Sequence, residues 1–238
     1  MNASTRRSLT IIGAVAIVIL LITGAVLSAP DMDTGDAETS SQTAADPRAA
    51  EDDLGIARRN ADDMTALGDV DAPLVLIEYS DYRCPFCGVF ARDTMPVLID
   101  EYIETGKLRF EWRDMPVFGD ASVDGAVAAR AAGQQDLYWE YHDAMYAGAP
   151  ERGHLEINDE KIIAWAKEVG VPDMAKFKAD LEDPDVLGAV EADAAEGRSL
   201  GASGTPTFIL GEKPLVGALP LDTFREEIDA QLEEVNES

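Results

Sequence analysis

Apolar and polar positions form clear patterns over the second part of the chain. The apolar run Leu74–Ser80 follows a proline and predicts a buried strand. After a tight turn over Asp81–Pro85, the apolar positions of Phe86–Glu104 predict a helix that Pro96 kinks. Leu108–Arg113 alternates Leu, Phe and Trp with Arg and Glu, which predicts a second strand.

The remaining elements complete an α/β pattern. Residues 122–200 predict helices throughout, with breaks near residues 148–153, 170–172 and 183–184. A hairpin is predicted over residues 207–216, with its turn at residues 211–213. A last amphipathic helix carries apolar residues on one side, namely Leu221, Phe224, Ile228 and Leu232. Strand, helix, strand, helical block, hairpin and helix together predict a mixed sheet with a parallel centre.

The N-terminus carries a long uncharged segment. Nineteen residues from Leu9 to Leu27 would form a helix about 28 Å long, enough to cross a bilayer. Arg6 and Arg7 precede it, so the positive-inside rule predicts that residues 1–8 are cytoplasmic and that the rest of the chain is extracytoplasmic. We expect residues 9–28 to be a retained single-pass anchor in the cell membrane, because the run is longer than that of a secretory signal. Cleavage would make the protein secreted.

A polar segment separates this anchor from the remaining residues. Between Asp33 and Asp53 there is no Val, Ile, Leu, Phe, Tyr or Trp, so nothing there can offset the entropy of ordering. Residues 29–63 are therefore predicted to be an acidic disordered linker. The remainder, residues 64–238, has the size of one ordinary domain.

Composition narrows the classes of function. The chain has 46 Asp and Glu against 19 Lys and Arg, a formal net charge of -27. A surface this negative repels phosphate, so we expect no nucleic-acid partner. The same excess is typical of a solvated, soluble surface. With 46% apolar residues the chain can bury a core. Separately, we expect the protein to be a monomer.

Candidate chemistry is concentrated in the only two cysteines, Cys84 and Cys87. Cys84 falls at the predicted start of a helix, where free N–H groups and the helix dipole favour the thiolate. Cys87 lies on the same side of the first turn and can close a disulfide with it. Pro85 suits an early helical position, and Phe86 brings no charge. Arg83 is either a further stabiliser of the thiolate or a solvated side chain.

Three interpretations of the pair remain open. The C-x-x-C spacing after a strand and the oxidising compartment favour a redox-active dithiol. A purely structural disulfide is the alternative, although such a short loop constrains the unfolded chain little. A zinc site would need two more ligands, and His142 and His154 are too far apart in sequence for a usual ligand pair. His142 is interpreted as a helix-packing or surface residue.

Two motifs and the helical block between them carry a family likeness. Asp81-Tyr-Arg-Cys-Pro-Phe-Cys87 follows an apolar strand, and Gly204-Thr-Pro-Thr207 precedes the hairpin. With the aromatic segment 138–142, they resemble the DsbA-like thiol:disulfide oxidoreductase family over about residues 64–232. The resemblance implies a thioredoxin fold with a mixed central sheet and a helical subdomain inserted at about residues 120–200.

The resemblance also implies roles for individual residues. Cys84 matches the exposed nucleophile of the family and Cys87 its resolving partner. Pro206 matches a cis-proline facing the disulfide, and Thr205 a residue whose backbone pairs with an extended substrate. Glu78 matches an acidic position beneath the active site that assists proton transfer, where burial would raise its pKa. The alternatives are a trans Pro206 that enters an edge strand, and a Glu78 on a partly exposed strand face.

The predicted function is that of an extracytoplasmic enzyme that donates its Cys84–Cys87 disulfide to cysteine-containing exported proteins, with no cofactor. The resemblance implies a quinone-linked membrane oxidase as the partner that reoxidises it. The Pro85-Phe86 dipeptide departs from the Pro-His of the strongly oxidising family member, so Pro85, Phe86 and Arg83 are candidates for tuning the redox potential. A tethered disulfide reductase or isomerase is the alternative within the class. A non-catalytic binding or chaperone module with a structural disulfide is the alternative outside it.

Overall fold

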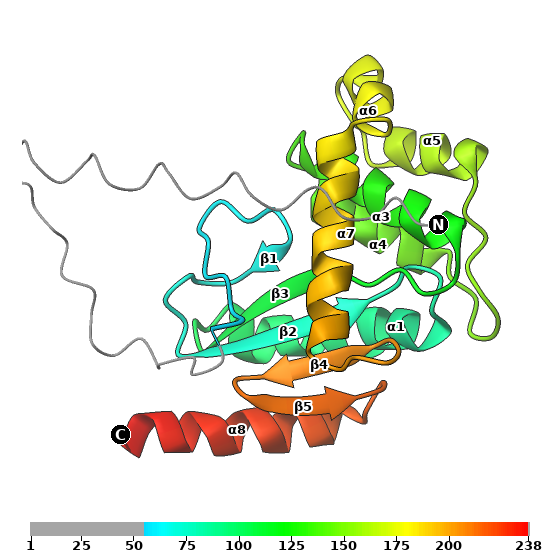
Figure 1. Cartoon of the computed structure of the whole chain (residues 1–238). Coiled ribbons are helices and arrows are strands. Elements are labelled where there is room, and N and C mark those ends of the chain that lie inside the picture. The colour runs from blue at the N-terminus through cyan, green and yellow to red at the C-terminus, as the bar shows by residue number, and fades with distance from the viewer. Residues whose placement is uncertain (1–54, 238) are drawn as a thin grey trace, which may run out of the picture. The chain divides into compact units, whose positions relative to one another are not determined.

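The computed structural model describes residues 55–237, so the predicted anchor at residues 9–28 and most of the linker lie outside it. A five-stranded sheet with the order β1-β3-β2-β4-β5 forms the centre (Figure 1). β2 and β3 are parallel, and the other neighbouring pairs are antiparallel, as the predicted mixed sheet requires. The strands are β1 (Ala66–Leu67), β2 (Leu74–Ser80), β3 (Leu108–Asp114), β4 (Thr207–Leu210) and β5 (Lys213–Val216).

The helix after β2 is less regular than predicted. α1 (Pro85–Val89) and α2 (Met95–Leu98) are each followed by a wider π-helical turn, at Phe90–Thr94 and Ile99–Ile103. Pro96 cannot donate the backbone hydrogen bond of a regular helix. The backbone adapts with a wide turn, in which the Met95 N–H donates to the Phe90 carbonyl oxygen.

The predicted helical block is confirmed as five helices within residues 120–199. They are α3 (Asp120–Gly133), α4 (Tyr138–Ala147), α5 (Asp159–Glu168), α6 (Met174–Asp180) and α7 (Pro184–Ser199). Asn158, Asp173 and Asp183 cap the last three of these helices with their side chains. A break at residues 134–137 was not predicted. The chain ends in α8 (Leu221–Glu237), which buries Phe224, Ile228 and Leu232.

The two faces of the sheet differ, because ion-paired side chains are buried beside apolar ones on one of them. One face is apolar, with Phe90, Phe110, Phe208 and Phe224 packed together. On the other face, α7 crosses in front of β2 and β3 (Figure 1) and covers charged groups.

These buried charges form a network of ion pairs. Glu111 of β3 pairs with Arg109 at 2.8 Å and with Arg113 at 2.7 Å, and these three side chains are at most 3% exposed. Arg113 also reaches Glu196 of α7 at 3.2 Å. Burial by itself raises the pKa of Glu111. Hydrogen bonds from Arg109 and the Arg58 backbone, with the charge of Arg113, outweigh it and lower this pKa to about 2.

The segment that precedes β1 packs on this charged face. The backbone N–H groups of Arg58 and Arg59 donate to the Glu111 carboxylate at 3.0 and 2.9 Å. The Arg58 guanidinium pairs with Asp193 at 2.6 Å, and Ile56 is buried. The prediction of a linker up to residue 63 is therefore wrong for its described part. Hydrogen bonds and ion pairs hold this segment in place, and the prediction considered only its lack of apolar residues.

Two glycines of α7 give a matched prediction. A Cβ on Gly197 would lie 2.7 Å from the Tyr79 ring, whereas a Cβ on Gly188 meets nothing within 4 Å. We expect Gly197→Ala to destabilise the fold by about 1 to 3 kcal/mol through overpacking. Gly188→Ala should stabilise it by about 0.5 to 1 kcal/mol, because alanine is the better helix former. Urea unfolding of both variants tests this, and equal changes in the two would contradict it.

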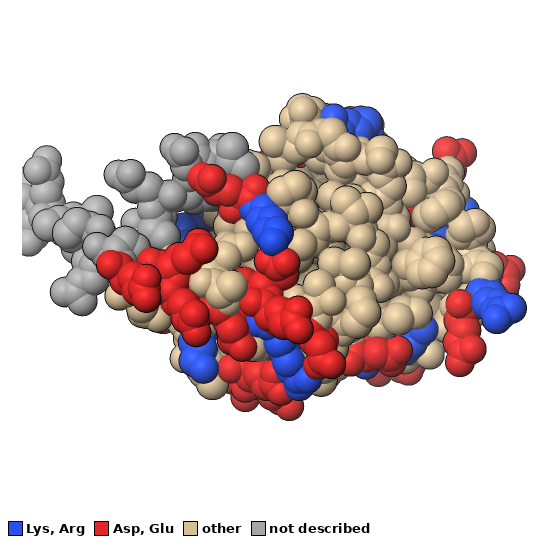
Figure 2. All heavy atoms as spheres, turned by 90° about the horizontal axis from the view of Figure 1, so that it is seen from below, with Lys and Arg blue, Asp and Glu red and all other residues tan. Residues whose placement is uncertain are grey.

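Acidic side chains gather on part of one face of the described residues. Figure 2, a view from below, shows acidic side chains gathered over one half of this face and uncharged atoms over much of the other half. α8 contributes strongly, with Asp222, Glu226, Glu227, Asp229, Glu233, Glu234 and Glu237. The described surface therefore has the solvated acidic character that composition predicts.

Candidate active site

The cysteines lie at the junction between the end of β2 and the start of α1. Cys84 is the N-cap of α1, Pro85 opens the helix and Cys87 lies in its first turn. Both thiols are free, and Cys84 is 2% and Cys87 0% exposed. The resemblance implied an exposed nucleophile, but the structure buries most of Cys84. The segment before β4 lies against it, with the Thr205 carbonyl oxygen 3.3 Å from the sulfur.

The environment of Cys84 stabilises its thiolate. A hydrogen bond from Cys87 contributes most and outweighs the effect of burial, and the pKa of Cys84 falls to about 6. The backbone N–H groups of Cys87 and Phe86 lower this pKa further. The backbone contributions are those expected at a helix N-terminus. Cys84 is therefore largely ionised at neutral pH.

This ionisation gives a measurable pH profile. In the reduced chain, we expect alkylation of Cys84 by iodoacetamide to rise with pH around a midpoint of about 6. Below that midpoint the thiol is protonated and the rate falls. Cys87→Ala removes the largest stabilising contact and should move the midpoint to higher pH. Mass spectrometry after timed quenching measures the rate, and a midpoint near 9 in the unmodified chain would contradict the prediction.

Cys87 and Glu78 are held in the opposite state. Burial is the largest cause that raises the pKa of Cys87 well above 9, followed by the hydrogen bond to Cys84 and the charge of Glu78. Glu78 is 1% exposed, and burial raises the pKa of its carboxyl group to about 8. One of its carboxyl oxygens, Oε1, has no hydrogen-bond partner. The structure thus places Glu78 in the core beside the cysteines, and not on a partly exposed strand face.

The second predicted motif also reaches the cysteines. The Thr205–Pro206 peptide bond is cis, as the family resemblance implied. The Cys84 sulfur lies 3.3 Å from the Thr205 carbonyl oxygen, and the Thr205 hydroxyl is buried without a hydrogen-bond partner. Two segments far apart in the sequence therefore meet at one sulfur.

The three candidate tuning residues differ in their positions. Pro85 begins α1, and Phe86 is 63% exposed next to the buried pair. The Arg83 guanidinium donates to the carbonyl oxygens of Leu155 and Phe118. These hydrogen bonds direct Arg83 to the loops beside the cysteines, so it is neither a solvated side chain nor a hydrogen-bond partner of the Cys84 sulfur.

Two polar side chains near the cysteines were not predicted. Ser80 is 1% exposed, and its Oγ lies 3.4 Å from the hydroxyl oxygen of Tyr146. The Tyr146 hydroxyl in turn donates to the Asp81 carbonyl oxygen at 3.2 Å. The alternation of a strand places Ser80 on the same face as Glu78 and could have revealed it. Tyr146 comes from α4, and no sequence signal connects it with β2.

The histidines have separate environments. The ring of His142 is buried among Tyr82, Trp112, Trp139 and Tyr146, which fits its interpretation as a packing residue. His154 is exposed, and its Nδ1 lies 3.1 Å from the Arg83 carbonyl oxygen. Within residues 55–237, no three His, Cys, Asp or Glu side chains form a group that could hold a metal ion.

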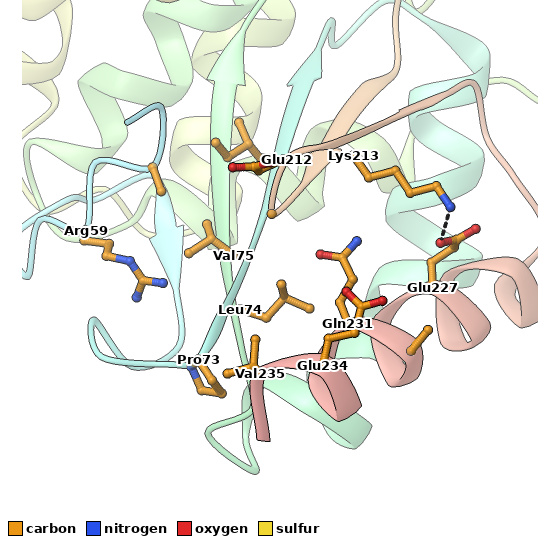
Figure 3. A pocket seen from close by; sticks show the side chains of 14 residues that line it. Arg59, Pro73, Leu74, Val75, Glu212, Lys213, Glu227, Gln231, Glu234 and Val235 are labelled. Atoms are coloured by element: carbon orange, nitrogen blue, oxygen red, sulfur yellow. Dashed lines mark hydrogen bonds and ion pairs between the residues drawn. The ribbon is translucent and has the colours of Figure 1, made fainter. Parts of the chain in front are cut away.

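A separate pocket lies away from the cysteines. It has a volume of about 510 Å³ and is bordered by the first half of β2, the hairpin turn and α8. Figure 3 shows Leu74 and Gln231 at this pocket, and the ion pair of Lys213 with Glu227 beside it. It contains none of the predicted site residues, because Cys84 follows the other end of β2.

A protein-family model described as thioredoxin matches residues 60–230. The chain belongs to the thioredoxin family. Within this family, it is 28% identical over 170 residues to the Bacillus cereus protein named "Probable disulfide bond formation protein D", which covers 70% of this chain and 78% of that protein.

Solved structures of the thioredoxin family give the same fold. Oxidised BdbD from Bacillus subtilis aligns with a TM-score of 0.66 and 24% identity, over 71% of this chain and 92% of that one. The thiol-disulfide exchange protein α-DsbA2 from Wolbachia pipientis aligns with a TM-score of 0.61 and 27% identity, over 70% of this chain and 86% of that one.

These findings confirm the predicted resemblance to DsbA-like proteins and the thioredoxin fold with a helical insertion. They also support the enzyme class, thiol:disulfide oxidoreductase. No helix between residues 55 and 237 is long and apolar enough to cross a membrane. The predicted membrane segment at residues 9–28 lies outside the described residues.

Proposed function

We propose that the protein is an extracytoplasmic thiol:disulfide oxidoreductase that donates its Cys84–Cys87 disulfide to cysteine-containing exported proteins. The main support is the asymmetry of the pair. The pKa of Cys84 is about 6 and that of Cys87 is well above 9, although the two residues share one helical turn. A sulfur whose thiolate is stabilised is a good leaving group, so a mixed disulfide at Cys84 readily passes to the substrate.

The reaction has two exchange steps. A substrate thiolate attacks the Cys84 sulfur, the bond between Cys84 and Cys87 breaks, and Cys87 leaves as a thiolate that takes up a proton. A second substrate thiolate then attacks the substrate sulfur of the mixed disulfide, and Cys84 leaves as its stable thiolate. The substrate loses two electrons and gains a disulfide, while the enzyme becomes a dithiol.

The surrounding residues have distinct tasks in this proposal. Glu78, whose pKa of about 8 lies close to neutrality, exchanges a proton with Cys87. Thr205 and Pro206 line the approach to the sulfur, and the Thr205 backbone pairs with the extended substrate. The Thr205 carbonyl oxygen lies 3.3 Å from the Cys84 sulfur, so this carbonyl is within reach of any chain bound at Cys84. Phe86, 63% exposed, offers an apolar contact to such a chain.

The proposal includes the cellular setting. The segment at residues 9–28 would hold the domain at the membrane, next to a quinone-linked oxidase that restores the disulfide, and the enzyme would act as a monomer. The name of the Bacillus cereus relative, disulfide bond formation protein D, supports a role in making disulfides.

The redox potential of the pair tests this function. The full-length chain is equilibrated in glutathione buffers, and the fraction of reduced Cys84–Cys87 is measured by alkylation and mass spectrometry. A potential well above that of thioredoxin, about -270 mV, and towards that of DsbA, about -120 mV, is expected for a disulfide donor. A value near that of thioredoxin would instead favour a reductase. A pair that resists reduction throughout would leave a structural disulfide.

A further inference from the structure

Ser80 is a buried serine at the end of β2, on the same strand face as Glu78 and towards the core that contains Cys87. We infer that Ser80 passes the proton between Glu78 and Cys87, and that Tyr146 positions its hydroxyl between transfers. This inference rests on the proposed function, because it concerns the second cysteine of the same redox pair. It adds two residues, one from the end of β2 and one from α4, to the reaction.

The geometry of β2 brings Ser80 to this place. Side chains two positions apart in a strand share one face, so Glu78 and Ser80 extend the row that begins with Leu74 and Leu76. Those two leucines lie in the same core cluster as Cys84 and Cys87. At the end of an otherwise apolar row, two buried polar side chains therefore face the helix that carries the cysteines. A core position without a polar task would favour an apolar side chain.

The Ser80 hydroxyl contacts Tyr146 and affects the ionisation of two further groups. Its Oγ lies 3.4 Å from the Tyr146 hydroxyl oxygen. Hydrogen bonding from Ser80 also lowers the pKa of Glu78 and of Cys87, in each case against the larger effect of burial. One hydroxyl group thus stabilises the ionised form of both partners in the transfer.

The Tyr146 hydroxyl oxygen accepts a hydrogen bond from the Ser80 hydroxyl between proton transfers. The Tyr146 hydroxyl uses its own proton in the bond to the Asp81 carbonyl oxygen, so its oxygen is left to accept from Ser80. Burial first, and then the charges of Cys87 and Glu78, raise the pKa of Tyr146 well above 10. Tyr146 therefore stays neutral while Glu78 and Cys87 titrate.

The transfer conserves protons in both directions. When the disulfide opens, the Cys87 thiolate takes the hydroxyl proton of Ser80, and Ser80 takes the proton of the Glu78 carboxylic acid. The products are a Cys87 thiol and a Glu78 carboxylate. When Cys87 attacks a mixed disulfide at Cys84, the same protons move back, Cys84–Cys87 forms, and the partner leaves as a thiolate.

Few titratable groups can contribute to the resulting pH profile. The titratable groups around Ser80 are Glu78 on β2, Cys87 in α1 with Cys84 at its N-cap, and Tyr146 on α4. Tyr82, in the connecting turn, packs against the Tyr146 ring. Burial is the largest cause that holds the pKa of Tyr82 well above 10, as it does for Tyr146. A change between pH 5 and 9 therefore reports on Glu78 and the cysteine pair.

The test separates the two cysteines kinetically. The reduced full-length chain is mixed with excess glutathione disulfide. Attack by Cys84 gives a mixed disulfide in a second-order step, and attack by Cys87 then releases glutathione in a first-order step. Acid quenching and mass spectrometry follow both steps from pH 5 to 9.

Loss of one buried hydrogen bond predicts a first-order step about 3- to 10-fold slower at pH 7 in Ser80→Ala. Its pH midpoint should move upward, while the second-order step stays within about twofold of the parent rate.

Matched variants separate a proton path from a structural effect. Ser122 is also 1% exposed, and its hydroxyl has no partner, so Ser122→Ala removes a buried hydroxyl elsewhere and should change neither step. Ser80→Thr keeps the hydroxyl and should restore the midpoint. Tyr146→Phe keeps Ser80 in place and should slow the first-order step less than Ser80→Ala. It also tests the proton-transfer path if Ser80→Ala does not fold.

The outcomes distinguish this inference from the proposed function. An unchanged first-order step and midpoint in Ser80→Ala, or in Tyr146→Phe if only that variant folds, would overturn the role of Ser80 and leave the function intact. Equal slowing of both steps would indicate a general structural effect and would also overturn it. No mixed disulfide in the unmodified chain would overturn the proposed function and this inference together.

Discussion

Replacing Cys84 by serine is expected to lower the rate of dithiol oxidation in a reduced substrate by at least about 10³-fold, because the chain then lacks its attacking and leaving sulfur. A serine hydroxyl cannot form a disulfide, and Cys87 cannot take over this role. The pKa of Cys87 lies well above 9, so its thiolate is scarce at neutral pH. The assay is the oxidation of a reduced two-cysteine peptide by the full-length chain.

Cys87→Ser provides the contrast to Cys84→Ser. It retains the reactive sulfur but cannot resolve an intermediate, so with glutathione disulfide it should accumulate an adduct at Cys84 that mass spectrometry detects. Cys84→Ser should form no adduct under the same conditions. An adduct on Cys87 in Cys84→Ser would show that the second sulfur is accessible, and it would contradict the assignment of roles.

The second large effect concerns stability and involves the buried network on β3. Glu111→Gln removes the anionic partner that Arg109 and Arg113 share, and leaves two guanidinium groups buried without it. Breaking a buried ion pair in this way destabilises a fold by about 3 to 5 kcal/mol. Urea unfolding of the reduced chain at pH 7, monitored by tryptophan fluorescence, measures this loss.

A surface ion pair provides the control for this prediction. Glu101 binds Arg225 at 2.6 Å, but both side chains are partly exposed, so Glu101→Gln should change stability far less than Glu111→Gln. Similar losses in the two variants would contradict the view that burial makes the β3 network important.

Acid should reveal the same network in the unmodified chain. The folded pKa of Glu111, about 2, lies below the ordinary value of 4.5. A carboxyl group with a depressed pKa contributes its full stability above pH 4.5 and loses it as pH falls towards 2. We therefore expect the difference in stability between the unmodified chain and Glu111→Gln to shrink over that window. A constant difference would contradict this assignment.

Local patterns predicted most of the fold. The strands at β2 and β3, the hairpin and α8 follow from runs of apolar and β-branched residues, which register directly in the sequence. β1, with two residues, and the segment around Arg58 were missed because long-range hydrogen bonds and ion pairs hold them. No local pattern in the sequence records such partners.

In the candidate site too, residues in local motifs were predicted, whereas long-range contacts were not. Cys84, Cys87 and Pro206 were found through motifs, and Glu78 through its position relative to them. The partners of Arg83 were not predicted, since its hydrogen bonds go to loops whose approach only the tertiary fold determines. Ser80 could have been read from strand alternation, but Tyr146 comes from another helix.

The opposite characters of the two faces of β3 have a consequence for folding fidelity. Along this strand, Arg109, Glu111 and Arg113 alternate with Leu108, Phe110 and Trp112. A slip of one residue against β2 would turn every side chain to the other face. Three charges would then enter the aromatic core, while the aromatic rings would meet the acidic side of α7. A shifted register of β3 is therefore penalised on both faces at once.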